Sequence, residues 1–176
     1  MPVILPDYLQ PGLRIVFVGT AVGTKSAERG HYYAGPGNEF WRFLHVAELT
    51  PRLLAPDEDA TLPSYGIGLT DLAKHIAQSH DRGLTFDLPA FTAKIQQYQP
   101  VVVAFTSKQA ATVYARHLGE RVASYGAAVW TVAGRAAYVL PSPSAANRTP
   151  TNPPRVAWWR SLAHFAHDTV RGLIVE

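Results

Sequence analysis

Residues 13–41 read LRIVFVGTAVGTKSAERGHYYAGPGNEFW, and this stretch decides the fold. Residues 13–18 form an apolar run of β-branched and aromatic types, which is typical of a strand buried on both faces in a parallel sheet. A loop with Gly19 and Gly23 follows, and Asn38 is a good N-cap for a helix over residues 38–47. Open α/β sheets bind ligands at the carboxyl ends of their strands, so we expect function first in the loop at 19–37.

Length and composition narrow the class of protein. A chain of 176 residues predicts one domain, residues 1–176, with a substantial core. The absence of cysteine excludes disulfides, thiolate zinc sites, iron–sulfur clusters and cysteine nucleophiles. The N-terminus has no charged leader or cleavage site, and no run of about 18 apolar residues occurs, so we expect a cytoplasmic protein. A formal net charge of +3 permits nucleic-acid binding without requiring it.

Strands and helices alternate along the chain. Helical periodicity predicts further helices over 89–98, with Asp87 as a possible cap, from Ser107, which is placed to cap, to Leu118, and over 156–173. Apolar β-branched runs predict further strands at 65–72, 101–105, 129–132 and 137–140, with a turn at Gly134 between the last two. This alternation indicates an α/β fold in which helices cover both faces of a parallel sheet.

Two loops have a composition that suits chemistry. The first, GTAVGTKS at 19–26, resembles a phosphate-binding P-loop, but its glycines are too close and Thr24 separates Gly23 from Lys25. Flexible glycines in a turn are the simpler interpretation of that pair. The second loop, LPSPSAANRTP at 140–150, follows a strand and is small, rich in hydroxyl groups and stiffened by proline. Such a loop suits close approach to a phosphate backbone.

Together the two loops resemble the uracil-DNA glycosylase superfamily, and most closely its mismatch-specific uracil/thymine branch. In that branch a strand and a G-I-N-P-G loop lead to F-A-H-P-x-N-x-F-W, and a late N-P-S-G-L-S loop enters the DNA. This chain has YAGPGNEFW at 33–41 and LPSPSAANR at 140–148. YGIGLTDL at 65–72 stands at a G-V-T-K-L or G-F-T-N-I segment, and VVVAFTSKQA at 101–110 stands at the stretch ending G-K-Q-A.

The resemblance implies a three-layer α/β/α fold with a central, mainly parallel four-stranded sheet. It also implies base flipping and hydrolysis of the N-glycosidic bond, without metal or cofactor. Tyr33 stands where the family stacks an aromatic on the flipped base, and Asn38 matches a family asparagine. Asp71 stands where several branches read the uracil edge with asparagine, and burial would favour its protonated form. From the residues alone, Asp71 is equally well explained as a cap for the segment that starts near Leu72, and Asn38 can be a helix cap and a site residue at once. Without the resemblance, Tyr33 is better explained as an aromatic that packs under the loop. The implied base-binding set is Gly19, Thr20, Ala21, Tyr33, Asn38 and Asp71.

The chain departs from the family in two places. Ala21 stands where the family holds its water-positioning asparagine or aspartate, and Ser142 stands where other branches use histidine or asparagine. The hypoxanthine-specific branch also lacks the first-loop asparagine, so the resemblance still implies an active enzyme. The candidates for the missing chemistry are Asp71, Asn38, His31 and Asn147, with Ser142 or Ser144 hydrogen-bonding the base.

The late loop and several basic residues are expected to contact DNA. Residues 145–148 would form the wedge that fills the gap left by the flipped nucleotide. The expected DNA-binding residues are Lys25, Lys108, Gln109, Ala145, Ala146, Asn147 and Arg148. His164 and His167 are one helical turn apart, but no HExxH-type context accompanies them, so we predict no metal site.

The sequence thus predicts a monomeric, monofunctional uracil-DNA glycosylase. The alternatives are a glycosylase for another deaminated base such as hypoxanthine, a non-catalytic binder of damaged DNA, and a small-molecule α/β enzyme that uses the first loop for phosphate.

Overall fold

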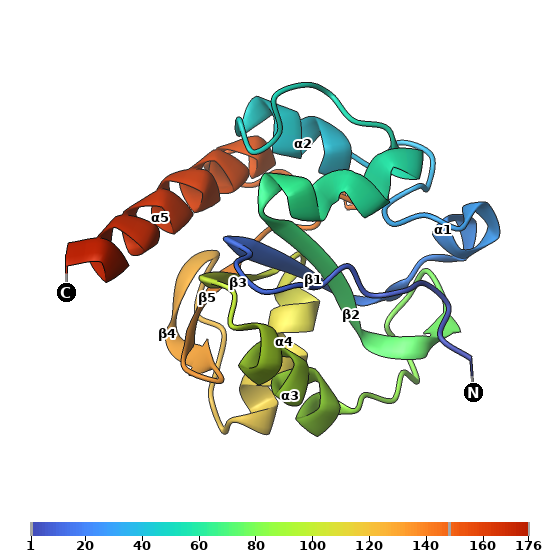
Figure 1. The fold of residues 1–176 in the computed structure, drawn as a ribbon. Helices are drawn as coiled ribbons and strands as arrows, with labels where there is room; N and C mark the ends of the chain where they lie inside the picture. The colour runs from blue at the N-terminus through green and yellow to red at the C-terminus, as the bar shows by residue number, and fades with distance from the viewer. Residues whose placement is uncertain (1, 148, 176) are drawn as a thin grey trace.

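A computed structural model describes residues 2–147 and 149–175 of the chain. Its centre is a five-stranded sheet with the strand order β2-β1-β3-β5-β4 (Figure 1). The strands are β1 (Ile15–Val22), β2 (Ile67–Ala77), β3 (Val102–Phe105), β4 (Gly126–Val132) and β5 (Arg135–Val139). β2, β1, β3 and β5 run parallel, whereas β4 pairs antiparallel with β5. The α/β class and the mainly parallel sheet are therefore confirmed.

The sheet has one strand more than the four that the resemblance implies, because β4 lies at its edge, and it contains all five strands predicted from the apolar runs. β4 and β5 form a hairpin whose two turn residues, Ala133 and Gly134, have φ of 48° and 78°. Positive φ at both central residues gives a turn whose twist matches that of the flanking strands. The Gly134 turn predicted between two strands is thus confirmed.

The helices lie close to their predicted positions. They are α1 (Thr24–Arg29), α2 (Phe40–Val46), α3 (Leu88–Tyr98), α4 (Lys108–His117) and α5 (Arg155–Val175), with a 3-10 helix η1 (Pro56–Tyr65). The Asp87 side chain accepts from the Ala90 amide, and the Ser107 hydroxyl accepts from the Ala110 amide, both at 3.0 Å. These two residues therefore cap α3 and α4 as predicted. No helix in the described part of the chain is long and apolar enough to cross a membrane.

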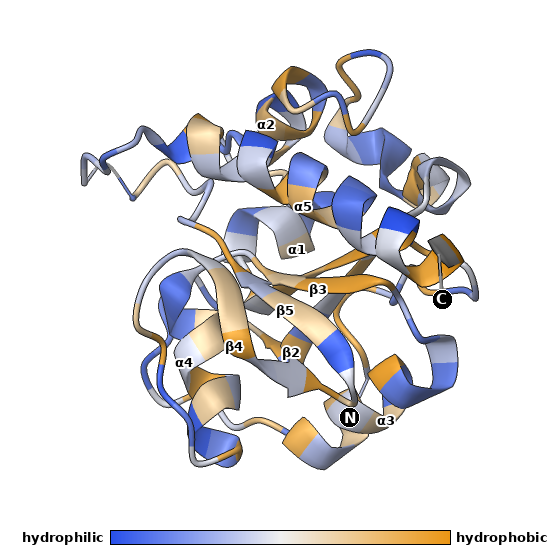
Figure 2. Ribbon diagram, turned by 90° about the vertical axis from the view of Figure 1, so that its left-hand side faces the viewer, coloured by the Kyte–Doolittle hydropathy of each residue, from blue (hydrophilic) through white to orange (hydrophobic). Residues whose placement is uncertain are grey.

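Alternate residues of β1 face two separate cores. Ile15 and Phe17 are fully buried with residues of α2 and α5, whereas Val16 and Val18 are fully buried with residues of α3 and α4. This alternation follows from the two-residue period of a strand and explains why the run at 13–18 is continuously apolar. Figure 2 shows the same hydrophobic character along β3, next to β1 in the sheet. The three layers are helices, sheet and helices.

Two differences from the sequence-based boundaries affect the functional region. β1 continues past residue 18 to Val22, and α1 occupies part of the stretch expected to be loop. β2 runs to Ala77 rather than ending near 72. The pairing of β1 with β2 shifts register after Ala21, where Val22 pairs with Ala77. The chain after β2 therefore returns to the end of β1.

Candidate active site

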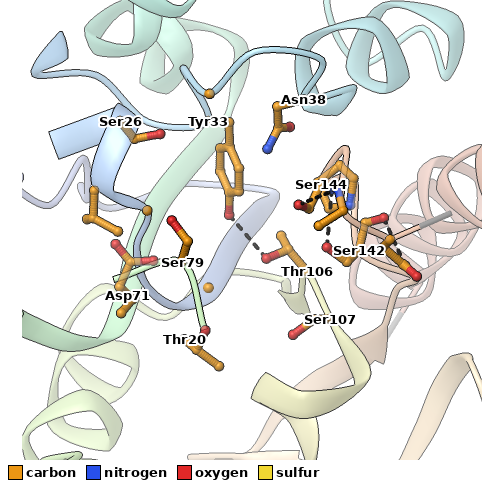
Figure 3. A pocket seen from close by; sticks show the side chains of 18 of the residues that line it. Thr20, Ser26, Tyr33, Asn38, Asp71, Ser79, Thr106, Ser107, Ser142 and Ser144 are labelled. Atoms are coloured by element: carbon orange, nitrogen blue, oxygen red, sulfur yellow. Dashed lines mark hydrogen bonds between the residues drawn. The ribbon is translucent and has the colours of Figure 1, made fainter. Parts of the chain in front are cut away.

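A cavity of about 660 Å³ lies at the carboxyl ends of β1, β2 and β3. Its described lining comes from the segments 19–26, 32–38 and 78–81, from Asp71, from the residues Thr106, Ser107 and Gln109 that follow β3, and from the late loop. Figure 3 shows Tyr33 and Asn38 on one side of this space, with Thr106 and Ser142 across from them. The size and position are those of a small-molecule or nucleobase site in an open α/β fold.

Gly19 and Asp71 are partners in the pairing of β1 with β2. A Cβ atom added at Gly19 would lie 2.5 Å from Asp71 Oδ1 and 3.6 Å from the Tyr33 hydroxyl. Real Cβ atoms do not approach an oxygen so closely, so only glycine leaves room for the Asp71 carboxyl at this point. The first glycine of the loop is therefore required by packing against the cavity wall.

Asp71 is a buried carboxyl group on the cavity wall, only 4% exposed. Its Oδ2 atom has no hydrogen-bond partner among the described residues. Burial raises the pKa of Asp71 from 3.8 to about 6, and the negative charge of Asp7 adds to this, while Lys74 and Lys94 act in the opposite direction. A buried, unsatisfied polar oxygen costs free energy, so this group is set to bind something that enters the cavity.

The raised pKa makes the stability of the protein depend on pH. Between pH 4 and pH 6 the folded protein holds a proton on Asp71 that the unfolded chain has lost, so the free energy of unfolding falls as pH rises through this window. Asp71→Asn removes the ionisation. We expect it to raise the free energy of unfolding at pH 7.5 by up to about 3 kcal/mol and to change little at pH 4. Urea unfolding at both pH values checks this, and an equal effect at both would contradict a raised pKa.

Tyr33 presents an aromatic ring to the cavity. The ring stacks on Phe40 with the ring centroids 3.9 Å apart and the planes at 17°. Its hydroxyl lies 3.2 Å from the Thr106 hydroxyl, which itself donates to the Val18 carbonyl, so the tyrosine is the donor to Thr106. Burial raises the pKa of Tyr33, so the hydroxyl is neutral. The ring is thereby held as a fixed, uncharged surface for stacking.

Asn38 lies on the cavity wall, and its side chain also accepts a hydrogen bond at the start of α2. Its side-chain oxygen accepts from the Phe40 amide at 2.9 Å, although the helix begins at Phe40 rather than at residue 38. The carbonyl of the side chain is thus engaged, while the NH₂ group is the donor that remains for a ligand. Both of the roles considered for this residue are compatible with its position.

The late loop is tied to the start of α2 and α5 by Arg155. Its guanidinium donates to the carbonyl oxygens of Ser142 and Ser144, at 2.6 Å and 3.2 Å, and pairs with the Glu39 carboxylate. The Glu39 amide in turn donates to the Pro143 carbonyl at 2.9 Å. These contacts fix the backbone of the loop where its serines line the cavity.

Arg155→Ala is expected to lower the free energy of unfolding by about 2–3 kcal/mol, because it removes charge-assisted hydrogen bonds from a guanidinium that is only 18% exposed. The matched control is Arg160→Ala, since Arg160 is exposed on the same helix. Urea unfolding measures both. Equal, small effects of the two substitutions would mean that the contacts of Arg155 add nothing to stability.

Residues 78–81 form a second polar wall that the sequence did not predict. The Thr20 hydroxyl donates to Asp81 Oδ1 at 2.6 Å, and the Ser79 and Thr24 hydroxyls lie 3.1 Å apart. The Gln78 amide donates to the Val22 carbonyl at 2.9 Å. Ser79 and Asp81 line the cavity beside the first loop.

Most of the predicted site residues meet at this cavity. The predicted residues in its described lining are Gly19, Thr20, Ala21, Lys25, Tyr33, Asn38, Asp71, Gln109, Ser142, Ser144, Ala146 and Asn147. Thr106, Ser107 and Ser26 also line it and were not predicted.

The other predicted residues lie elsewhere. His31 is outside the described lining, and its ring nitrogen lies 3.2 Å from the buried Asp59 carboxylate, so the structure gives it a partner in the core. Lys108 lies over the Tyr125 ring, with its ammonium 5.4 Å from the ring centroid. Ala145 is not in the described lining, although its neighbours Ser144 and Ala146 are. Arg148 lies outside the described residues.

The described residues contain no group of three or more histidine and acidic side chains that could hold a metal ion. The cavity instead offers two carboxyl groups, Asp71 and Asp81, together with hydroxyl and amide groups. Such a site suits polar recognition of a planar ring and acid–base chemistry.

Comparison with known proteins agrees with this geometry. The model of the uracil DNA glycosylase superfamily matches residues 6–163. A solution NMR structure of a proposed uracil DNA glycosylase from Methanosarcina acetivorans has a similar fold, with a TM-score of 0.59 and 22% sequence identity over 93% of this chain and 96% of that chain. At that identity the likeness supports the fold alone. Because the family match spans most of the chain, the protein belongs to the uracil DNA glycosylase superfamily.

Proposed function

We propose that the protein is a monofunctional uracil-DNA glycosylase that flips uracil out of DNA, hydrolyses its N-glycosidic bond and leaves an abasic site. Membership of the superfamily supports a DNA glycosylase and DNA as its partner. One observation supports a base that, like uracil, carries an N–H beside a carbonyl: the Tyr33 ring and the Asp71 carboxyl group, whose Oδ2 has no partner among the described residues, lie on the wall of the same cavity.

The two side chains match two features of the base. The face of the Tyr33 ring offers a surface for stacking, which is worth about 1–3 kcal/mol per base in single-stranded nucleic-acid complexes. A protonated Asp71 can donate to uracil O4 while its second oxygen accepts from N3–H. The ionised form would offer acceptors only and would repel the anion that forms as the base leaves. Burial favours the protonated form because it raises the pKa of Asp71.

The remaining lining residues would stabilise the departing base. The Asn38 NH₂ group and the hydroxyl groups of Ser142 and Ser144 lie on the cavity wall. Fixed donors aimed at developing negative charge are effective because they need no reorganisation during the reaction. Arg155 holds the backbone of the late loop, so the positions of both serines are set before DNA binds.

A lyase step through a lysine Schiff base is not part of the proposal. Lys25 is the lysine in the described lining, and its side chain is 60% exposed and paired with Glu28 at 3.0 Å. A Schiff-base lysine is usually desolvated in an apolar pocket, whereas Lys25 is exposed to solvent and paired with a carboxylate. Water is therefore the proposed nucleophile. The expectation of a monomer in the cytoplasm stays a prediction.

The same edge of the cavity also suits hypoxanthine, because hypoxanthine N1–H and O6 present the donor and acceptor that uracil presents with N3–H and O4. The substrate is therefore tested with end-labelled duplexes that carry one uracil, one hypoxanthine or one mismatched thymine, followed by alkali cleavage. The proposal predicts the fastest cleavage at uracil. Faster cleavage at hypoxanthine would mean that hypoxanthine, rather than uracil, is the substrate. Binding without cleavage of any strand would indicate a damaged-DNA-binding protein.

A further inference from the structure

The first loop lacks a side chain that could position and deprotonate the water molecule for hydrolysis. Ala21 lines the cavity, but its methyl group can neither orient a water molecule nor accept a proton from one. If the protein hydrolyses a glycosidic bond, another group at this part of the cavity must do so. The identity of that group rests on the proposed function.

We propose that Asp81 is the catalytic residue that positions and deprotonates the water in this enzyme. Asp81 lines the cavity, and its Oδ1 accepts from the hydroxyl of Thr20, the residue directly before Ala21, at 2.6 Å. A carboxylate from the chain after β2 therefore stands beside the position that Ala21 leaves without a functional group. With one oxygen bonded to Thr20, the carboxylate has a fixed orientation and its second oxygen can accept from water.

The turn that carries Asp81 is braced on both sides. The Gln78 side-chain amide donates to the His80 carbonyl at 2.5 Å and to the Arg82 carbonyl at 2.9 Å, which brackets Asp81. Ser79 contacts Thr24, and the Gln78 backbone amide bonds to Val22, so the turn is fastened to the first loop. A general base must be held within hydrogen-bond reach of its water, and these contacts provide that.

The other candidates are engaged differently. The Asn38 side-chain oxygen accepts from the Phe40 amide, and the hydroxyl oxygens of Ser142 and Ser144 accept from backbone amides of their own loop. His31 pairs with Asp59 outside the described lining. Asp71 is buried and proposed to be protonated when it reads the base, so it cannot also accept the proton of the water. Asp81 is half-buried and is the second carboxyl group in the described lining.

The reaction balances with water as the only co-reactant. The bond between N1 of uracil and C1′ of the deoxyribose breaks, and its electron pair leaves with the base as an anion. The water oxygen forms a new bond to C1′, and one water proton passes to the Asp81 carboxylate. That proton returns to solvent, and the base anion takes a proton as it is released. No oxidation or reduction occurs.

The test compares single-turnover excision of uracil by wild type, Asp81→Asn and Asp81→Ala. A general base contributes about 100-fold or more, so both variants should be slower by at least that factor. Binding to DNA that contains non-cleavable 2′-fluoro-2′-deoxyuridine should change less than about threefold, because the base-reading residues are intact. Added formate should partly restore Asp81→Ala, since a small carboxylate can occupy the vacated space, whereas a lost structural contact would not be restored.

Asp87→Asn is the matched control. Asp87 caps α3 through the Ala90 amide, and asparagine caps equally well, so this variant should excise uracil at the wild-type rate. Thr20→Val removes the hydroxyl that orients Asp81, so it should slow excision on its own and add little to Asp81→Asn. If the effects of the two substitutions on the excision rate multiply in the double variant, Thr20 does not act through Asp81.

The outcomes separate this inference from the proposed function. If wild type excises uracil and Asp81→Asn retains more than about a third of the wild-type rate, the role of Asp81 is overturned. The glycosylase activity is then still established. A slow Asp81→Asn with proportionally weakened binding would also overturn it, because the residue would then act in binding. A wild-type protein that excises no base would overturn the proposed function and this inference with it.

Discussion

Asp71→Ala is expected to lower kcat/KM for uracil excision by about 100-fold, which corresponds to two hydrogen bonds of about 1.4 kcal/mol each. The reason is the position of the carboxyl group, which is buried on the cavity wall with one oxygen unpartnered among the described residues. Alanine at this position offers nothing to O4 or N3–H of the base. Steady-state excision from a uracil-containing duplex measures the effect.

Asp71→Asn distinguishes the two roles that a carboxyl group can have here. An amide, like a protonated carboxyl group, donates from one atom and accepts at the other, so Asp71→Asn should excise uracil at pH 6 at a rate close to wild type. The wild-type rate should fall as pH rises through about 6, because Asp71 then loses the proton that it donates to the base. The variant should not show this fall. A loss of about 100-fold or more in Asp71→Asn at every pH would contradict base reading and make Asp71 a general base.

Gly19→Ala is expected to abolish most activity although it adds a single methyl group. The new Cβ atom would lie 2.5 Å from Asp71 Oδ1, so the carboxyl group or the strand must move. A displacement of about 1 Å in a catalytic geometry costs about 100-fold, and overpacking of this kind also destabilises proteins by about 1–3 kcal/mol. Excision rate and thermal unfolding of the purified variant measure the two effects.

Gly23→Ala is the control for this substitution. Gly23 lines the same cavity, but a Cβ atom there would lie 3.9 Å from the Ser79 hydroxyl, which is an ordinary contact. We expect nearly wild-type activity and stability. Loss of activity in both variants would show that the whole loop, rather than the contact of Gly19 with Asp71, is sensitive to added volume.

The fold was largely predictable because its signals are local. The apolar run at 13–18 and the run at 101–105 identified β1 and β3, and the N-caps at Asp87 and Ser107 marked the starts of α3 and α4. The helix α1 was missed because it has six residues and no apolar stripe. The extension of β2 to Ala77 was missed because its last residues are half-buried or exposed at the sheet edge.

The site was predictable only where the family pattern supplied the residues. Tyr33 and Asn38 come from one segment and Asp71 from another at 65–72, and the fold brings the two segments to one cavity. Asp81 was not predictable in this way. Its place in the cavity depends on the register shift after Ala21 and on its hydrogen bond with Thr20, and neither leaves a periodic signal in the sequence. His31 was predicted as a site residue but is not in the described lining of the cavity. Its ring nitrogen instead pairs with the buried Asp59 carboxylate, and this contact cannot be read from the sequence.

The central claim is that a chain with Ala21 in its first loop still hydrolyses the glycosidic bond. The most direct measurement incubates excess purified protein with a duplex carrying one uracil and quantifies free uracil and abasic sites over time. The proposed function predicts equal amounts of the two products, appearing in a single exponential. Tight binding of the duplex with neither product formed would contradict it and would identify the protein as a binder of damaged DNA.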